Sequence, residues 1–274
     1  MYDVAGPVFQ LLVRGPRGPG AVAIRGAGLD ATRQIGLIPA MTDSAALKRA
    51  AAARALDFVS DGMKLGLGSG TTAEVFVELL GARVRGGLTL TCVPTSERTA
   101  QLARTLGIVL ANLDDLAPLD LVVDGADEAD PQFNLIKGGG GALLREKIVA
   151  VSAKRMVVIG DGSKLVKKLG RFPLPVEVLE FGHATTAKRI ADVAAALGYR
   201  NTAMVLRNKD GAVFKTDSGN VIYDCAFGAI TDAGALATAL SCATGVVEHG
   251  LYVGIAQTLV IARASGVEVT ERAE

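Results

Sequence analysis

The segment from Gly66 to Thr72, Gly-Leu-Gly-Ser-Gly-Thr-Thr, combines residue types that bind anions. Glycine lets the backbone approach a ligand closely, and the amides at a helix start, with Ser and Thr hydroxyls, form a cradle suited to phosphate. The spacing departs from the Gly-x-Gly-x-x-Gly dinucleotide motif, and the sequence contains no Gly-Lys pair of the Walker A type. We therefore predict phosphate binding here, with a plain glycine-rich connection as the alternative.

A second segment, Asp124-Gly125-Ala126-Asp127-Glu128, follows an apolar run that predicts a strand. Ligands of open α/β sheets bind outside the carboxyl ends of the strands. Three carboxylates within five residues repel one another, and burial could raise the pKa of one of them. Such a cluster suits acid/base chemistry, but a metal site or a solvated turn would explain it equally well.

A third segment is Lys137 followed by four glycines, Gly138 to Gly141, and then by Glu146 on a predicted helix. Four consecutive glycines lose much conformational entropy on folding, so a plain loop explains them poorly. Their amides could form a nest that stabilises a developing enediolate, with Glu146 as the carboxylate facing it. The alternative for Glu146 is a surface salt bridge with Arg145 or Lys147.

The fourth segment, Gly160 to Lys164, places a lysine after another predicted strand, where it could reach an anion or lie in solvent. Apolar periodicity predicts that strands alternate with helices, which favours a Rossmann-like, mostly parallel sheet covered by helices on both faces. The four segments would then meet at one rim of the sheet. The strands are predicted at 63–67, 88–93, 119–123 and 156–159, and the helices at 44–58, 73–80, 96–106 and 142–151.

The pattern changes after the segment Arg171-Phe172-Pro173-Leu174-Pro175. Strands at 176–179 and 203–206, a strand pair around 217–220, and helices at 184–197 and 233–240 predict a smaller α+β, ferredoxin-like unit. Residues 250–262 then return to the first sheet. We therefore predict a catalytic domain over 41–170, a small domain over 171–248, and a return to the catalytic domain over 249–274.

Residues 1–40 are rich in Gly, Pro and Arg, and we expect little order there. They form either a leader or a mis-assigned start, because Met41 is followed directly by Thr42-Asp43-Ser44, which suit a helix N-cap. A transit peptide is an alternative, since the segment is rich in Arg and poor in acidic residues.

The composition excludes several classes of partner. Lys and Arg number 29 and Asp and Glu 28, a formal charge of +1, which argues against nucleic acid and anionic membranes as partners. No apolar run reaches the roughly 18 residues of a membrane span. Three cysteines without a C-x-x-C pair and two distant histidines predict no metal site, and they favour a reducing cytoplasm.

Taken together, these segments closely resemble the ribose-5-phosphate isomerase A family from about Ser44 to the C-terminus. The most specific blocks are 66–72, 124–130, 137–147, 161–164 and 172–177. The resemblance implies isomerisation of D-ribose 5-phosphate to D-ribulose 5-phosphate through a cis-enediol(ate), in the non-oxidative pentose phosphate pathway. It further implies no metal and no organic cofactor, a small-molecule sugar phosphate as partner, and a homodimer or homotetramer.

The resemblance also implies roles for individual residues. Glu146 matches the base that moves the proton, with Asp124, Asp127 and Lys137 as its catalytic companions. Lys48 and the loop from Ser69 to Thr72 match the phosphate site. The full set implied to bind substrate is Lys48, Ser69, Gly70, Thr71, Thr72, Asp124, Gly125, Ala126, Asp127, Lys137, Gly138, Gly139, Gly140 and Lys164.

Three other classes of protein are alternatives. A phosphosugar-sensing module would need a DNA-binding segment and a basic patch, which neither the leader nor the charge balance supplies. A nucleotide-dependent dehydrogenase or kinase is disfavoured by the unmatched fingerprints. An acyl or CoA transferase with a catalytic glutamate would leave Lys137 and the phosphate cradle unexplained.

Overall fold

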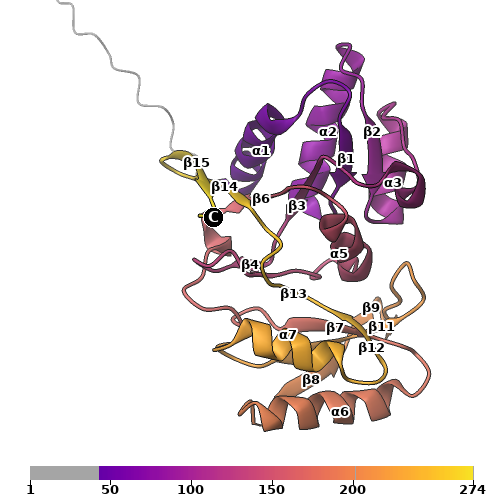
Figure 1. The fold of residues 1–274 in the computed structure, drawn as a ribbon, viewed down its shortest axis with the longest axis vertical. Coiled ribbons are helices and arrows are strands. Elements are labelled where there is room, and N and C mark those ends of the chain that lie inside the picture. Colours follow the sequence, from indigo (N-terminus) through magenta and orange to yellow (C-terminus); the bar gives the residue numbers. More distant parts are fainter. Residues whose placement is uncertain (1–42, 201, 274) are drawn as a thin grey trace, which may run out of the picture. The chain divides into compact units, whose positions relative to one another are not determined.

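The structure, a computed structural model, describes residues 43–200 and 202–273 (Figure 1). The predicted leader over residues 1–40 lies outside these described residues. The first described element is the helix α1 (Ser44–Ala55), whose N-cap is Asp43: its carboxylate accepts a hydrogen bond from the Ala45 amide. This agrees with the cap predicted from the sequence, because a short polar side chain satisfies an amide that the helix leaves free.

The larger part of the described chain is built around a six-stranded sheet. Its strands are β1 (Lys64–Leu67), β2 (Thr91–Pro94), β3 (Leu121–Gly125), β6 (Met156–Asp161), β14 (Thr258–Arg263) and β15 (Gly266–Glu271). They lie in the order β15-β14-β6-β3-β1-β2, and all neighbours are parallel except β14 and β15. The predicted parallel sheet is confirmed. After residue 250 the chain enters this sheet again with β14, which pairs with β6.

Helices cover both faces of this sheet because its strands are apolar on both sides. Leu121 and Val123 pack into one core cluster with α1 and α2 (Thr71–Arg85), whereas Val122 between them packs into another with α5 (Leu143–Val151). The helix α3 (Glu97–Thr105) is capped by Ser96, as predicted, and α4 (Leu113–Leu116) is a single turn. Short 3-10 turns lie at Leu56–Phe58, directly after α1, and at Gly162–Lys164, directly after β6.

A four-stranded antiparallel sheet forms the second part. It contains β7 (Leu174–Val178), β8 (Ala203–Leu206), β11 (Val221–Ala226) and β12 (Val246–His249) in the order β12-β7-β11-β8. Two helices, α6 (His183–Ala196) and α7 (Ala233–Ser241), pack against it. Element order and strand order together give the predicted ferredoxin-like arrangement.

A small three-stranded sheet joins the segments around the rim. Its strands β4 (Glu128–Ala129), β5 (Leu135–Ile136) and β13 (Leu251–Tyr252) lie in the order β13-β5-β4. Glu128 is fully buried here, and its carboxylate accepts hydrogen bonds from the Gly170 and Phe172 amides at 2.7 Å each. These hydrogen bonds connect the segment that leads into the antiparallel sheet to β4, which follows β3.

The structure differs from the sequence prediction at several boundaries. The helix predicted at 73–80 extends over Thr71–Arg85, and the strand predicted at 88–93 is shorter and shifted, since it runs over Thr91–Pro94. The predicted strand pair around residues 217–220 is a turn leading into β11, while the tight hairpin of β9 (Asn208–Lys209) and β10 (Ala212–Val213) turns at Asp210 and Gly211. Turn residues occur at both places, so local composition did not distinguish them.

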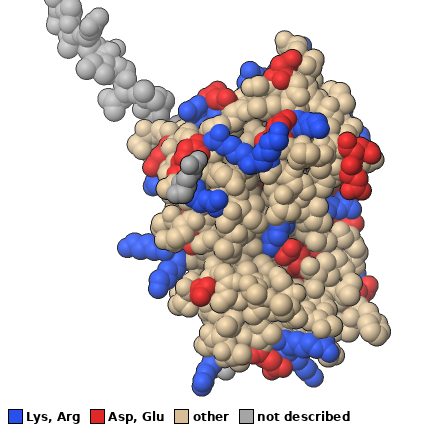
Figure 2. All heavy atoms as spheres, viewed as in Figure 1, with Lys and Arg blue, Asp and Glu red and all other residues tan. Residues whose placement is uncertain are grey.

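The charged side chains on the face drawn in Figure 2 are mixed in sign, with basic and acidic residues next to one another. Across residues 43–200 and 202–273, no helix combines the length and apolar character needed to cross a membrane.

Candidate active site

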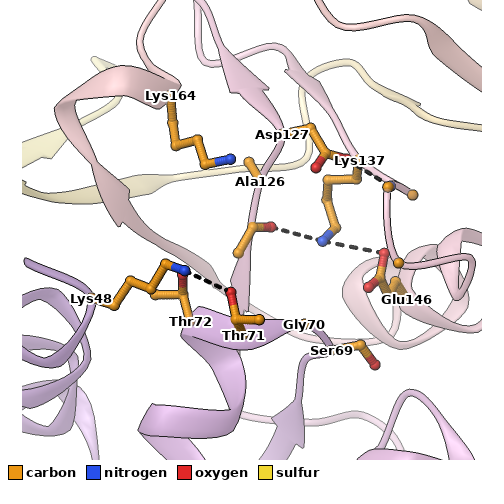
Figure 3. A pocket seen from close by; sticks show the side chains of 14 residues that line it. Lys48, Ser69, Gly70, Thr71, Thr72, Ala126, Asp127, Lys137, Glu146 and Lys164 are labelled. Atoms are coloured by element: carbon orange, nitrogen blue, oxygen red, sulfur yellow. Dashed lines mark hydrogen bonds and ion pairs between the residues drawn. The ribbon is translucent and has the colours of Figure 1, made fainter. Parts of the chain in front are cut away.

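One cavity at the carboxyl edge of the parallel sheet brings the predicted segments together (Figure 3). It encloses about 130 Å³, which suits a small ligand better than a dinucleotide. Its lining includes every residue implied to bind substrate except Asp124, which lies behind Lys137, and it also includes Glu146. The lining residues are Lys48, Ser69, Gly70, Thr71, Thr72, Gly125, Ala126, Asp127, Lys137, Gly138, Gly139, Gly140, Glu146 and Lys164.

One end of the cavity carries amino and hydroxyl groups at the start of α2. Lys48 reaches across from α1, and its Nζ donates to Thr71 Oγ1 at 3.0 Å. Gly70 precedes the helix with φ of 88°, a conformation that glycine adopts readily. Lys164, from the turn after β6, points its amino group toward the same space in Figure 3. Two ammonium groups near the amino end of a helix form a site for an anion.

The glycines between Gly66 and Gly70 do not all serve the ligand, which corrects part of the sequence interpretation. A side chain at Gly68 would place its Cβ 2.1 Å from Asp124 Oδ1, and one at Gly66 would lie 2.7 Å from Val149. These two positions are glycine because the strand packs tightly against β3 and α5. The Ser69 hydroxyl is likewise engaged with protein, since it lies 2.8 Å from Thr95 Oγ1 and Ser96 Oγ.

The other end of the cavity contains a buried cluster of Lys137, Asp124 and Glu146. The Lys137 Nζ lies 2.8 Å from Asp124 Oδ2 and 3.3 Å from Glu146 Oε2, and it donates to the Gly125 carbonyl oxygen at 2.7 Å. The exposed fraction of each of these side chains is below 6%. One ammonium therefore faces two carboxylates in a setting where charge interactions are strong.

The protonation equilibria in this cluster are shifted from their ordinary values. Burial raises the pKa of Glu146 to about 8, with Lys137 opposing the shift and Asp124 adding to it. Burial also raises the pKa of Asp124, although Lys137 and the Gly125 and Ser69 amides stabilise its charge. For Lys137, burial acts to lower the pKa, but the two carboxylates outweigh it and the pKa rises. A carboxyl with a pKa near neutrality suits a general base.

Within the described residues, Glu146 Oε2 is buried and accepts no well-formed hydrogen bond, and its charged neighbour is the Lys137 ammonium at 3.3 Å. Helix α5 places this carboxylate in its first turn, next to the glycine loop. Buried polar atoms are nearly always hydrogen-bonded, so this carboxylate, which lines the cavity and is held mainly by the charge of Lys137, keeps acceptor capacity for a ligand. The alternative of a surface salt bridge for Glu146 is wrong, because the side chain is buried beside Lys137.

The glycine loop has a defined geometry. The Gly139 amide donates to Asp127 Oδ2 at 2.8 Å, and a Cβ at Gly139 would lie 2.6 Å from Asp127 Oδ1. Gly138 and Gly141 have φ of 103° and 85°. At Gly140, by contrast, a Cβ would meet nothing within 4 Å, which is consistent with its place on the cavity wall.

Tyr252 is a neighbour of this cluster that the sequence reasoning did not identify. It is fully buried, its hydroxyl donates to the Leu143 carbonyl oxygen at 3.0 Å, and the Lys137 Nζ lies 5.5 Å from its ring centre. Lys147 Nζ lies 5.0 Å from the same ring. Nothing in the sequence around Tyr252 indicates that it packs against Lys137, because the two residues are far apart in the chain.

Comparison with known proteins places the chain in a family. The family model of ribose 5-phosphate isomerase A, also named phosphoriboisomerase A, matches residues 91–266. Ribose-5-phosphate isomerase A of Parvibaculum lavamentivorans is 57% identical over 224 residues, which cover 82% of this chain and 97% of the relative.

Solved structures agree with this result. The ribose 5-phosphate isomerase of Plasmodium falciparum is 34% identical with a TM-score of 0.80, and that of Methanocaldococcus jannaschii is 37% identical with a TM-score of 0.77. Each match covers 84% of this chain and the whole of the other. The chain therefore belongs to the ribose 5-phosphate isomerase A family.

Proposed function

We propose that this chain interconverts D-ribose 5-phosphate and D-ribulose 5-phosphate in this cavity, with Glu146 moving the proton. The observation that carries the proposal is the buried Glu146 carboxylate, which lines the cavity next to the glycine loop and is ion-paired with Lys137 at 3.3 Å. Family membership supports the substrate. A related structure, 36% identical, is described as D-ribose-5-phosphate isomerase in complex with phospho-erythronic acid, a ligand with both a phosphate and a carboxylate.

The two ends of the cavity would hold the two ends of the substrate. The phosphate binds where Lys48, Thr71, Thr72 and Lys164 meet the amino end of α2. The carbonyl carbon and its neighbour then lie toward Lys137 and Glu146, on the opposite side in Figure 3. Binding energy at the phosphate thus fixes the position of the reacting carbons.

The proton transfer needs one carboxylate. Ionised Glu146 takes the proton from C2 of the open-chain aldose, and the electron pair moves through the new C1–C2 double bond onto O1, which gives the enediolate. The hydroxyl proton of O2 then passes to O1. Protonated Glu146 delivers its proton to C1 as O2 forms the C2 carbonyl, which gives the ketose and restores the base. Lys137 and the Gly140 amide, which donates to no protein group among the described residues, are placed to stabilise the negative charge that develops on oxygen. The family resemblance implies that Asp124 and Asp127 act on sugar hydroxyls and ring opening; of the two, Asp127 lines the cavity, and we assign these roles to it.

The test is the Glu146→Gln variant, assayed with ribose 5-phosphate after treatment of the protein with a chelator. Turnover should fall by about 10²- to 10⁴-fold, the typical contribution of a positioned base. Affinity for phospho-erythronic acid should be largely retained, because the amide has nearly the shape of the carboxyl group. Near-normal turnover in this variant would remove Glu146 from the role, and inactivity of both proteins with intact binding would favour a sugar-phosphate sensor.

We further propose that the chain acts in the cytoplasm as a homodimer or homotetramer. Cys92, Cys225 and Cys242 are free thiols, which is compatible with a reducing compartment. The domain boundaries proposed from sequence, 41–170, 171–248 and 249–274, are supported by the membership of the strands in the two larger sheets. Light scattering during size-exclusion chromatography would test the assembly, since a monomer would contradict it.

A further inference from the structure

Arg207 connects the antiparallel sheet to the glycine loop of the cavity. It directly follows β8, and its Nη1 donates to the carbonyl oxygens of Gly138 at 2.8 Å and Gly139 at 3.3 Å. The exposed fraction of its side chain is 14%. The sequence reasoning did not identify this residue, because it lies nearly 70 positions from the loop that it contacts.

The guanidinium group of Arg207 is itself held in place from the side away from the loop. Its Nε donates to Asp224 Oδ2 at 2.9 Å, and its Nη2 donates to Asp224 Oδ1, so the pair is bidentate. Such a fork fixes the plane of the guanidinium and leaves Nη1 directed at the loop. The Phe214 ring lies 5.9 Å from Arg207 Cζ and closes over Gly141, where a side chain would come within 2.5 Å of it.

This contact determines which way the loop amides point. In a trans peptide unit the carbonyl oxygen and the following amide hydrogen point in opposite directions. With the Gly138 oxygen toward Arg207, the Gly139 amide turns toward Asp127 and donates to it at 2.8 Å. The Gly139 oxygen also points toward Arg207, so the Gly140 amide hydrogen points away from Arg207. Within the described chain that amide donates to no protein group, and Gly140 lines the cavity.

We infer that Arg207, fixed by Asp224, is a positioning residue that holds the Gly138–Gly140 loop with the Gly140 amide directed at the reacting oxygen. Arg207 does not line the cavity and acts through the loop. This inference rests on the proposed function and deepens it, because it assigns part of the catalytic geometry to the antiparallel sheet.

The experiment compares Arg207→Gln, Arg207→Lys and Asp224→Asn with the unmodified protein. Lys215→Gln is the matched control, since Lys215 follows the same hairpin and pairs with Glu180, and among the described residues it makes no hydrogen bond or ion pair with the loop. For each protein, kcat and KM for ribose 5-phosphate are measured, together with the melting temperature and the affinities for phospho-erythronic acid and inorganic phosphate.

Arg207→Gln should lower kcat by about 10- to 100-fold, somewhat less than the loss of a whole oxyanion donor, and change KM by less than about 3-fold. Affinity for phospho-erythronic acid should fall while that for inorganic phosphate stays constant. Arg207→Lys should recover part of kcat because an ammonium still donates to the loop carbonyls, and Asp224→Asn should lie between the two. The control should match the unmodified protein.

Three results would overturn the inference. The first is a kcat of Arg207→Gln close to that of the unmodified protein, and the second is an equal loss in Lys215→Gln. The third is a lowered melting temperature with weakened inorganic phosphate binding, which would assign Arg207 to general folding. Failure of the proposed function is a separate result: the unmodified protein would then lack isomerase activity, or Glu146→Gln would keep it.

Discussion

The two ends of the cavity use lysine in different ways. Lys48 is half-buried and its ammonium contacts a hydroxyl, whereas Lys137 is 3% exposed and contacts two carboxylates and a carbonyl oxygen. The first arrangement leaves a cation with capacity for a ligand anion. In the second arrangement the charge of Lys137 is neutralised by the two carboxylates, and removing any of these groups would leave a buried charge without its partner. Such a cluster suits a place where charge shifts during the reaction. In the proposed mechanism, the phosphate contacts and the proton transfer would therefore lie at different ends of one small cavity.

The largest effect should come from Lys137→Met. This change leaves Asp124 and Glu146 buried together without their cation, so we expect turnover to be abolished and the free energy of unfolding to fall by about 3 kcal/mol. Denaturant titration near pH 7 measures the second quantity. Lys48→Met is the matched control and should have the same free energy of unfolding as the unmodified protein. An equal loss of stability in the two variants would contradict the difference between the two lysines.

The pH dependence sharpens the role of the buried end. Glu146 must ionise to act as a base, so kcat/KM should rise with pH and level off above about 8. Because its pKa is raised from 4.5, the folded state binds more protons than the unfolded state between about pH 4.5 and 8, and stability falls as pH rises through that range. Melting temperatures measured across this range test the sign.

Glu146→Gln is the control for that pH series. It lacks the ionisable group, so its melting temperature should decline less between about pH 4.5 and 8, while the raised pKa of Asp124 still contributes to both proteins. Identical slopes for the two proteins would mean that Glu146 titrates in the ordinary range.

At the exposed end, Lys48→Met should act mainly on binding. Loss of one charged contact to phosphate should raise KM for ribose 5-phosphate by about 10-fold or more, with kcat changed little, because the contact is the same in the ground and transition states. Steady-state kinetics separate the two constants. A fall in kcat with unchanged KM would instead place Lys48 at the reacting end.

The smallest effect distinguishes two neighbouring glycines. Gly139→Ala should displace Asp127 and lower turnover, because its Cβ would lie 2.6 Å from the carboxylate. Gly140→Ala has open space and should change the melting temperature by no more than a degree or two. Comparable losses of stability in both variants would show that backbone freedom, rather than contact with Asp127, determines the choice of glycine.

Much of the arrangement follows from local sequence. Apolar runs that end in glycine or aspartate predict the parallel strands, and the shared edge of such strands explains why Thr71, Asp127 and Lys164 meet. The sequence does not show that Asp124 lies behind Lys137, or that Gly68 is required by Asp124 rather than by a ligand. Arg207 and Tyr252 could not be predicted either, because their contacts depend on how two sheets pack together.

The late position of β14 in the chain has a consequence for folding during synthesis. This strand pairs in parallel with β6, but the whole antiparallel sheet is made between them. Tyr252, which packs beside Lys137, is also made only after that sheet. Pairing across so long a separation is slow, and an unpaired strand edge is prone to aggregation. On the ribosome, the edge of β6 therefore stays open, and the catalytic centre incomplete, until almost the last residues have emerged.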